Sequence, residues 1–213
     1  MTNKLKVLNL YAGIGGNRKL WTDVDVTAVE LNPEIAKIYQ DFFPDDKVIV
    51  GDAHQYLLDH YKEFDFIWAS PPCPSHSRAR YWASKGNKFD VIYPDMKLYQ
   101  EIILLQNYAS CQWVVENVIG YYTPLIIPIE IHRHYFWSNF GLYKERFNRI
   151  KTGFNKGDIH RWSDYHKFDI SKYKIKSYDK RQILRNCVFP ELGLHILNCA
   201  TKGGQLQLPI ETP

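Results

Sequence analysis

The stretch KVLNLYAGIGG, residues 6–16, places an apolar run directly before a turn that is rich in glycine. KVLNL is typical of a β-strand, and NRKLW, which follows the turn, can open a helix. The same order recurs up to residue 70: VTAVEL precedes NPEIAKIYQDFF, KVIV precedes HQYLLDHY, and FDFIWA leads into a proline-rich loop. Strands that alternate with helices predict an α/β fold with a doubly wound, Rossmann-like parallel sheet and helices on both of its faces.

The loops after the predicted strands are expected to lie together. In a doubly wound sheet, ligands bind at the carboxyl ends of the strands. The loops at residues 11–16, 30–32, 51–53 and 70–80 should therefore line one rim of the sheet. Four loops on one rim predict a binding site.

The remaining segments extend this pattern. The helix after VTAVEL should have Asn32 as its N-cap and Pro33 at its first position. YPDMKLYQEIILLQNYA predicts a helix from Pro94, QWVV predicts a buried strand, and RHYFWSNF is β-prone. Residues 142–180 lack strong periodicity, and helical character returns after Pro190. The length of 213 residues is expected of one main domain.

Composition narrows the function classes. The net charge of +4 is uneven, because residues 144–181 hold twelve Lys or Arg against five Asp or Glu, and such a basic segment favours a polyanionic partner. The four cysteines include no Cys-x-x-Cys pair, which indicates neither a zinc knuckle nor a disulfide framework. With no signal-like or membrane-spanning run, the sequence predicts a cytoplasmic protein without membrane contact.

Three loops suggest a cofactor that contains adenosine. Gly13, Gly15 and Gly16 can form a nucleotide-binding turn, although a tight connection between strand and helix would use the same residues. Glu30 ends the next strand, where an acid can accept hydrogen bonds from both hydroxyls of a ribose. Asp52 follows the third strand and could accept a hydrogen bond from an exocyclic amine.

The loop SPPCPSHSRAR, residues 70–80, holds a candidate nucleophile. A cysteine in a proline-stiffened turn is often inert. Here Arg78 and Arg80 follow Cys73 in the same loop and could favour its thiolate. Glu116, directly after an apolar strand, would reach the same rim and could act there as an acid. Together, a thiol and a carboxyl could attack an electron-poor ring and protonate it.

NLYAGIGG, VTAVELNP, VGDAH, SPPCPSHS and VVENV, and more loosely RNCVFP, occur in the order and spacing of the DNA (cytosine-5) methyltransferases, which the chain therefore resembles. The resemblance is close from residue 7 to about 140 and looser from 182 to 197. It implies a sheet that binds S-adenosylmethionine. It also implies that Cys73 adds to carbon 6 of a flipped cytosine, that Glu116 meets ring nitrogen 3, and that Asn117 holds the loop.

The resemblance also implies which residues bind the cofactor. They are Tyr11, Ala12, Gly13, Gly15, Gly16, Glu30, Leu31, Asp52, Ala53, Pro71 and Asn186. Tyr11 stands where the family usually has phenylalanine, and either ring can stack on the cofactor or pack beside it. Asn186 is the weakest of the set, because Arg185 precedes it where the family has a small residue.

A second departure concerns the cation that supports the cytosine. The family usually has Gln-x-Arg-x-Arg, whereas this chain reads IHRHYFW from Ile131. A strict alignment places His134 at the last arginine, and a slip by one residue places Arg133 there. We expect Arg133 as the third catalytic residue, because its charge is permanent. We expect no metal at His132 and His134, since no third ligand is near in the sequence.

Typical members of the family that the chain resembles insert a large target-recognition domain before the final motif. Here only residues 141–181 occupy that interval. The catalytic domain would comprise residues 1–140 and 182–213, with residues 141–181 as a minimal basic insertion. We expect this small insertion to clamp DNA and to read a short sequence, as in small phage-like or orphan enzymes; a solvated loop with a few packed aromatic residues is the alternative. The residues expected to contact DNA are Ser75, Arg78, Arg80, Lys144, Arg146 and Arg161.

The sequence therefore predicts a monomeric enzyme that methylates carbon 5 of cytosine in duplex DNA. A companion DNA-recognition protein or a cognate restriction endonuclease could act with it. Two alternatives remain open: a tRNA cytosine-5 methyltransferase, as in one branch of the family, and a silent or partner-dependent member that binds DNA. A nicotinamide dehydrogenase would explain the glycine turn and leave Cys73 and Glu116 unused.

Overall fold

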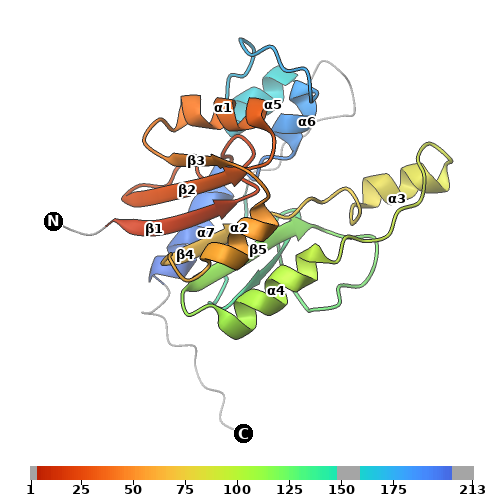
Figure 1. The fold of residues 1–213 in the computed structure, drawn as a ribbon. Helices are drawn as coiled ribbons and strands as arrows, with labels where there is room; N and C mark the ends of the chain where they lie inside the picture. Colours follow the sequence, from red (N-terminus) through yellow and green to blue (C-terminus); the bar gives the residue numbers. More distant parts are fainter. Residues whose placement is uncertain (1–3, 148–158, 203–213) are drawn as a thin grey trace, which may run out of the picture.

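The computed structural model describes residues 4–147 and 159–202 of the chain. Its seven-stranded sheet has the strand order β3-β2-β1-β4-β5-β7-β6 (Figure 1). The parallel strands are β1 (Leu5–Leu10), β2 (Val24–Glu30), β3 (Lys47–Val50), β4 (Phe66–Ala69) and β5 (Gln112–Val118). At one edge, β7 (His134–Ser138) is antiparallel to β5, and β6 (Ile129–Ile131) is antiparallel to β7. The predicted α/β sheet is confirmed, and its antiparallel edge is new.

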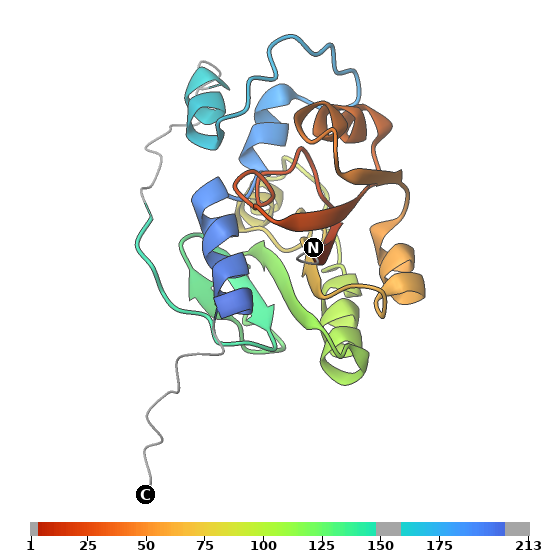
Figure 2. The same cartoon turned by 90° about the vertical axis from the view of Figure 1, so that its left-hand side faces the viewer.

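Helices cover both faces of the sheet. α2 (Ala53–His60) and α4 (Lys97–Tyr108) pack on one face, and α7 (Pro190–Lys202) packs on the other (Figure 2). α1 (Pro33–Phe42) lies next to α5 (Ile159–His166) and α6 (Lys180–Arg185), while α3 (Arg78–Lys85) projects from the body (Figure 1). None of the helices in the described part of the chain is long and apolar enough to cross a membrane.

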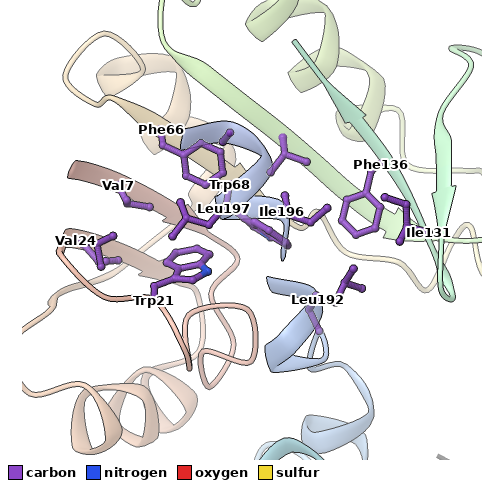
Figure 3. Close-up of a cluster of buried hydrophobic side chains, with 14 residues drawn as sticks. Val7, Trp21, Val24, Phe66, Trp68, Ile131, Phe136, Leu192, Ile196 and Leu197 are labelled. Atoms are coloured by element: carbon purple, nitrogen blue, oxygen red, sulfur yellow. The ribbon is translucent and has the colours of Figure 1, made fainter. Parts of the chain in front are cut away.

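The strands separate two hydrophobic clusters because successive side chains point to opposite faces. In β4, Phe66 and Trp68 belong to the cluster under α7, whereas Ile67 belongs to the cluster under α2 and α4. Figure 3 shows Ile196 and Leu197 of α7 in the first cluster. Burial of such a side chain stabilises the fold by about 1.5–3 kcal/mol, so α7 is a substantial part of the core.

The start of α1 agrees with the prediction. The side chain of Asn32 accepts hydrogen bonds from the backbone N–H groups of Glu34 and Ile35, at 2.9 and 3.2 Å. Pro33 occupies the first helical position, where its missing N–H costs nothing. This cap ends β2 sharply and leaves Glu30 at the rim of the sheet.

The helix predicted from NRKLW is wrong, because residues 16–20 form turns and Trp21 has no regular secondary structure. The cause is α7, whose backbone packs directly on this segment. A Cβ atom added at Gly193 would lie 2.3 Å from the carbonyl oxygen of Asn17. In addition, the indole N–H of Trp21 donates to the carbonyl of Gly193 at 3.1 Å. A contact this close leaves no space for the side chains of a helix.

Two other elements differ from the prediction. α4 begins at Lys97 rather than at Pro94. The basic end of the proline-rich loop continues into α3, where the hydroxyl of Ser77 caps the helix by accepting from the N–H of Arg80 at 3.1 Å. An N-cap bond between near neighbours is enough to start a short helix, even without an apolar stripe.

The described part of the interval 141–181 contributes to the core. Trp162, Phe168 and Ile170 are buried in one cluster with Ile38 of α1. The rings of Trp162 and Phe168 are therefore packed inside, as the alternative of a solvated loop with a few packed aromatic residues allowed, and the DNA clamp stays a prediction. Residues 148–158 of the same interval lie outside the described residues. The division into a catalytic domain and an insertion stays a prediction.

Candidate active site

A cavity of about 320 Å³ lies at the carboxyl ends of β1, β2, β4 and β5. Its lining includes residues from the four loops at 11–16, 30–32, 51–53 and 70–80, so the predicted rim is confirmed. Three further segments close it: the end of β5, the first residue of β7, and residues between 178 and 188. The sheet thus brings together side chains that are far apart in the sequence.

All but one of the eleven predicted cofactor residues line this cavity. They are Tyr11, Ala12, Gly13, Gly16, Glu30, Leu31, Asp52, Ala53, Pro71 and Asn186. The exception is Gly15, which packs against α1: with φ of +84°, a Cβ there would lie 2.3 Å from the ring of Phe43. Gly15 is thus needed for a close approach of the turn to α1, away from the cavity.

Backbone N–H groups hold Glu30 in place. Gly13 N–H donates to one carboxylate oxygen at 3.0 Å, and Asn32 N–H donates to the other at 2.9 Å. Burial raises the pKa of Glu30, and these backbone hydrogen bonds oppose the rise. Leu31 N–H also acts on this carboxylate, which offers about four acceptor positions, so acceptor capacity remains for a ligand hydroxyl. This geometry fits the predicted contact with a ribose.

Tyr11 is held by the carboxyl group of Glu101, which the sequence analysis did not single out. Its hydroxyl donates a short hydrogen bond to Glu101 of α4, and Nδ1 of His54 lies 2.9 Å from the same carboxyl oxygen. Burial raises the pKa of both Tyr11 and Glu101. Glu101 sits among apolar residues at helical spacing, and only the unusual tyrosine at position 11 could have pointed to it.

Asp52 has a structural role as well as a place in the cavity. Its side chain caps α2 by accepting from the N–H of His54 at 2.9 Å. The side chain is 56% exposed, with Lys97 Nζ at 4.0 Å from one oxygen. The carboxyl group therefore keeps free acceptor positions at the cavity, as the predicted contact with an exocyclic amine requires.

The loop with Cys73 is fastened at both ends. The carbonyl of Cys73 accepts from the N–H groups of His76 and Ser77 at 3.0 and 3.1 Å. The side-chain N–H of Asn117, at the end of β5, donates to the carbonyl of Pro71 at 3.0 Å. The prediction that Asn117 holds the loop is confirmed. Cys73 is half-buried and lines the cavity together with Glu116.

The electrostatic setting of Cys73 differs from the prediction. Burial, followed by the negative charge of Glu116, raises the pKa of its thiol to about 11. The arginines that should have favoured a thiolate bind elsewhere. Arg78 Nε donates to the carbonyl of Gly120 at 3.0 Å, and the guanidinium of Arg80 lies 4.7 Å from the ring centre of Phe89. In this structure the thiol is neutral at physiological pH.

His134, and not Arg133, meets Glu116. Nδ1 of His134 lies 2.5 Å from Glu116 Oε1, and both residues line the cavity. Arg133 is exposed in the turn between β6 and β7. The structure therefore places His134, the residue that a strict alignment indicates, beside Glu116, and Arg133 is not among the residues that line the cavity.

The residues predicted to bind DNA are placed unevenly. Ser75 is buried, and its hydroxyl accepts from the N–H of Asp95 at 2.9 Å, so it helps to hold the loop. Arg78 and Arg80 lie in the first turn of α3. The exposed residues Lys144, Arg146 and Arg161 lie on the segment after β7 and on α5.

The family can now be assigned. The model of the C-5 cytosine-specific DNA methylase family matches residues 5–123, which include the glycine turn, Cys73 and Glu116. The chain belongs to this family. No curated protein matches the sequence.

Solved structures are similar in fold at low identity. DNMT2 of Spodoptera frugiperda is 20% identical, with a TM-score of 0.44 over 71% of this chain and 56% of that chain. An S-adenosylmethionine-dependent methyltransferase of Agrobacterium tumefaciens is 15% identical, with a TM-score of 0.40 over 58% and 41%. A prophage-encoded protein of Escherichia coli, assigned as a DNA modification methyltransferase, is 17% identical, with a TM-score of 0.40 over 63% and 46%. The chain spans about half the length of these structures.

S-adenosylmethionine is the cofactor of this family, and the cavity fits it. Glu30 has acceptor positions free for a ribose, and a Cβ at Gly13 would meet nothing within 4 Å, which leaves open space in front of the turn. Within residues 4–147 and 159–202, no group of three His, Cys, Asp or Glu side chains could hold a metal ion.

Proposed function

We propose that the chain transfers a methyl group from S-adenosylmethionine to carbon 5 of cytosine in duplex DNA, through a covalent bond between Cys73 and a flipped base. One observation supports this most directly: Cys73, Glu116 and ten predicted cofactor residues share one cavity. Family membership makes cytosine-5 methylation the activity to expect. Duplex DNA as the substrate and the flipping of the base go beyond what family membership shows, and they are part of this proposal.

In the proposed reaction, Cys73 acts as the nucleophile and Glu116 as the acid. Cys73 Sγ forms a bond to carbon 6, and the electrons of the 5,6 double bond move toward carbon 5. Glu116 delivers a proton to ring nitrogen 3, which offsets the negative charge that enters the ring. When bound, S-adenosylmethionine supplies an electrophilic methyl group beside carbon 5. Solvent then takes the proton on carbon 5, and the electrons of that bond restore the 5,6 double bond as the Cys73 sulfur leaves, while Glu116 takes back the proton on ring nitrogen 3.

The α3 arm, residues 78–93, is the proposed DNA contact beside the cavity. It projects from the body and follows the Cys73 loop directly (Figure 1). Lys85 and Lys88 are exposed, and so are the rings of Trp82 and Tyr93. Ammonium groups favour phosphates, and exposed rings can stack on an unpaired base. With so little chain available for base contacts, we expect a short recognition sequence.

The test is transfer of a labelled methyl group to unmodified duplex DNA and to tRNA, followed by digestion to nucleosides and identification by mass. We expect 5-methyldeoxycytidine from DNA. A product found only in tRNA would move the chain to the RNA branch. A fully specified DNA site of six or more base pairs would contradict the short recognition sequence.

A trapping experiment tests the covalent step separately. Duplex DNA with 5-fluorocytosine cannot lose its substituent at carbon 5 after methyl transfer, so the bond to Cys73 should persist through denaturation. The matched control is Cys73→Ser on the same duplex, which should give no stable adduct. Cofactor binding without any adduct or product would favour the silent or partner-dependent alternative, which the high pKa of the free Cys73 thiol supports.

A further inference from the structure

The pairing of β5 with β7 decides which side chain meets Glu116. In this antiparallel register, Glu116 lies opposite Phe136, and Val118 lies opposite His134. Side chains two residues apart on a strand share a face, so His134 shares the face of Glu116 and lies diagonal to it. Arg133 precedes the strand, in the exposed turn. Strand register therefore selects a histidine for this position.

The register is fixed by two buried aromatic rings. Phe136 belongs to the cluster under α7, and Trp137 belongs to the opposite cluster, where its indole N–H donates to the carbonyl of Ile126 at 2.8 Å. A slip by one residue would send every side chain of β7 to the other face. It would bring Arg133 toward Glu116 only by exchanging the environments of both rings.

The contact between His134 and Glu116 is close and sheltered. The two atoms are 2.5 Å apart, and the side chains are 17% and 8% exposed. Such a sheltered carboxylate is costly unless a positive charge pairs with it. An arginine would always supply that charge, whereas a histidine supplies it only when protonated.

Several titratable and charged groups surround the contact between His134 and Glu116. The titratable and charged groups around His134 are Glu116 of β5, Cys73 after β4, His132 and Arg133 of the β6–β7 turn, His166 of α5 and Arg185 of α6. Burial, together with the charges of Arg133 and His134, lowers the pKa of His166 to about 3, so its ring is neutral. Burial keeps the thiol of Cys73 neutral as well. His134 makes the direct contact with Glu116.

We propose that His134 is a positioning residue that holds Glu116 in its imidazolium form, and that methyl transfer depends on that charge. This inference rests on the proposed function, so the protons are followed through the addition of Cys73 to the base. The bond from Sγ to carbon 6 releases the thiol proton, and ring nitrogen 3 gains a proton. Glu116 takes the first and delivers the second, while His134 keeps its own.

His134 also acts on Cys73 through Glu116. The carboxylate charge of Glu116 raises the pKa of the Cys73 thiol. An imidazolium beside that carboxylate cancels part of its charge, so the thiol ionises more easily. Loss of the imidazolium proton therefore weakens the nucleophile as well as the position of the acid.

The main experiment compares single-turnover rates on a cytosine duplex between pH 6 and 9. Wild type is compared with His134→Arg, His134→Gln and the control Arg133→Gln. As the pH rises across this series, the rate of His134→Arg relative to wild type should also rise, because the guanidinium keeps its charge at every pH. His134→Gln should be about a hundredfold slower at pH 6.5, and Arg133→Gln should follow wild type. A ratio that does not change with pH, or an equal loss in Arg133→Gln, overturns the proposal.

A second measurement needs no turnover. The rate at which iodoacetamide alkylates Cys73 in the substrate-free chain is followed by peptide mass at pH 7, with the half-buried Cys111 as internal reference. His134→Gln should slow Cys73 about tenfold, while His134→Arg should not slow it. Unchanged alkylation in His134→Gln overturns the proposal, even if His134→Arg fails to fold. A wild type that methylates no nucleic acid while alkylation changes as expected would remove the proposed function and leave the charge of His134 in place.

Discussion

The two ends of the cavity are built from different parts of the chain. At the cofactor end, backbone N–H groups from the glycine turn and the start of α1 hold Glu30, all within residues 13–32. At the base end, Cys73 and Glu116 depend on Asn117 and His134, which come from separate strands. The first end is set by local backbone geometry and the second by strand pairing. Damage to one end should therefore leave the other largely intact.

Replacement of Cys73 tests the base end most severely. Cys73→Ala should lower methyl transfer by a factor on the order of 10⁴ or more, because no nucleophile remains to activate carbon 5. The affinity for S-adenosylmethionine, measured by calorimetry, should stay within about twofold. Product formation by this variant would exclude Cys73 as the nucleophile.

Replacement of Glu30 tests the cofactor end. Glu30→Ala should weaken S-adenosylmethionine binding by about a hundredfold, since charge-assisted hydrogen bonding to a ribose hydroxyl is lost. The rate at saturating cofactor should change far less. Equal losses in affinity and in saturated rate would mean that the two ends are coupled. Asp52→Asn is the matched control: it removes one negative charge from the same end of the cavity and keeps an oxygen that can cap α2.

Asn117→Ala tests how the loop is fastened to β5. The carbonyl of Pro71 loses its donor, so the Cys73 loop should move relative to Glu116. We expect a rate about tenfold to a hundredfold lower, with unchanged cofactor affinity. Asn117→Ser, which can still donate over a shorter reach, should fall between the two. A normal rate in Asn117→Ala would show that the prolines alone fix the loop.

Glu101→Gln tests the support under Tyr11 through its pH dependence. Burial raises the folded-state pKa of Glu101, so the folded chain keeps this proton to a higher pH than the unfolded chain does. Wild type should therefore lose stability as the pH rises above the unfolded value of about 4.3. The neutral glutamine removes that loss, so urea unfolding should show a gain on the order of 1 kcal/mol at pH 8 and a smaller gain at pH 5. A larger gain at pH 5 would contradict the direction of the shift.

The contrast between the two ends also explains what the sequence could predict. Asn32, Pro33 and the loops after β1 to β4 are local signals, and the structure confirms them. The choice between Arg133 and His134 depended on a register that only the packing of Phe136 and Trp137 decides. No local pattern contains that information.

Two further predictions failed because they, too, depended on contacts between segments that are distant in the sequence or on the direction of the backbone. NRKLW has helical character, yet the carbonyl of Asn17 touches Gly193 of a helix at the other end of the chain. Arg78 and Arg80 are near Cys73 in sequence, yet the start of α3 turns them toward Gly120 and Phe89. Proximity in sequence predicted positive charge near the Cys73 thiol. The direction of the backbone at the start of α3 points both guanidinium groups away from it.

The packing of α7 has a consequence for synthesis of the protein. Phe66 and Trp68 lie on the sheet face that α7 covers, and α7 extends to Lys202. During translation, this face stays open to water after the first five strands are complete, until α7 leaves the ribosome. Contacts between distant segments also form late, because the closure of long loops costs entropy. The nascent chain should therefore recruit holding chaperones to its aromatic sheet face, and release should follow the docking of α7.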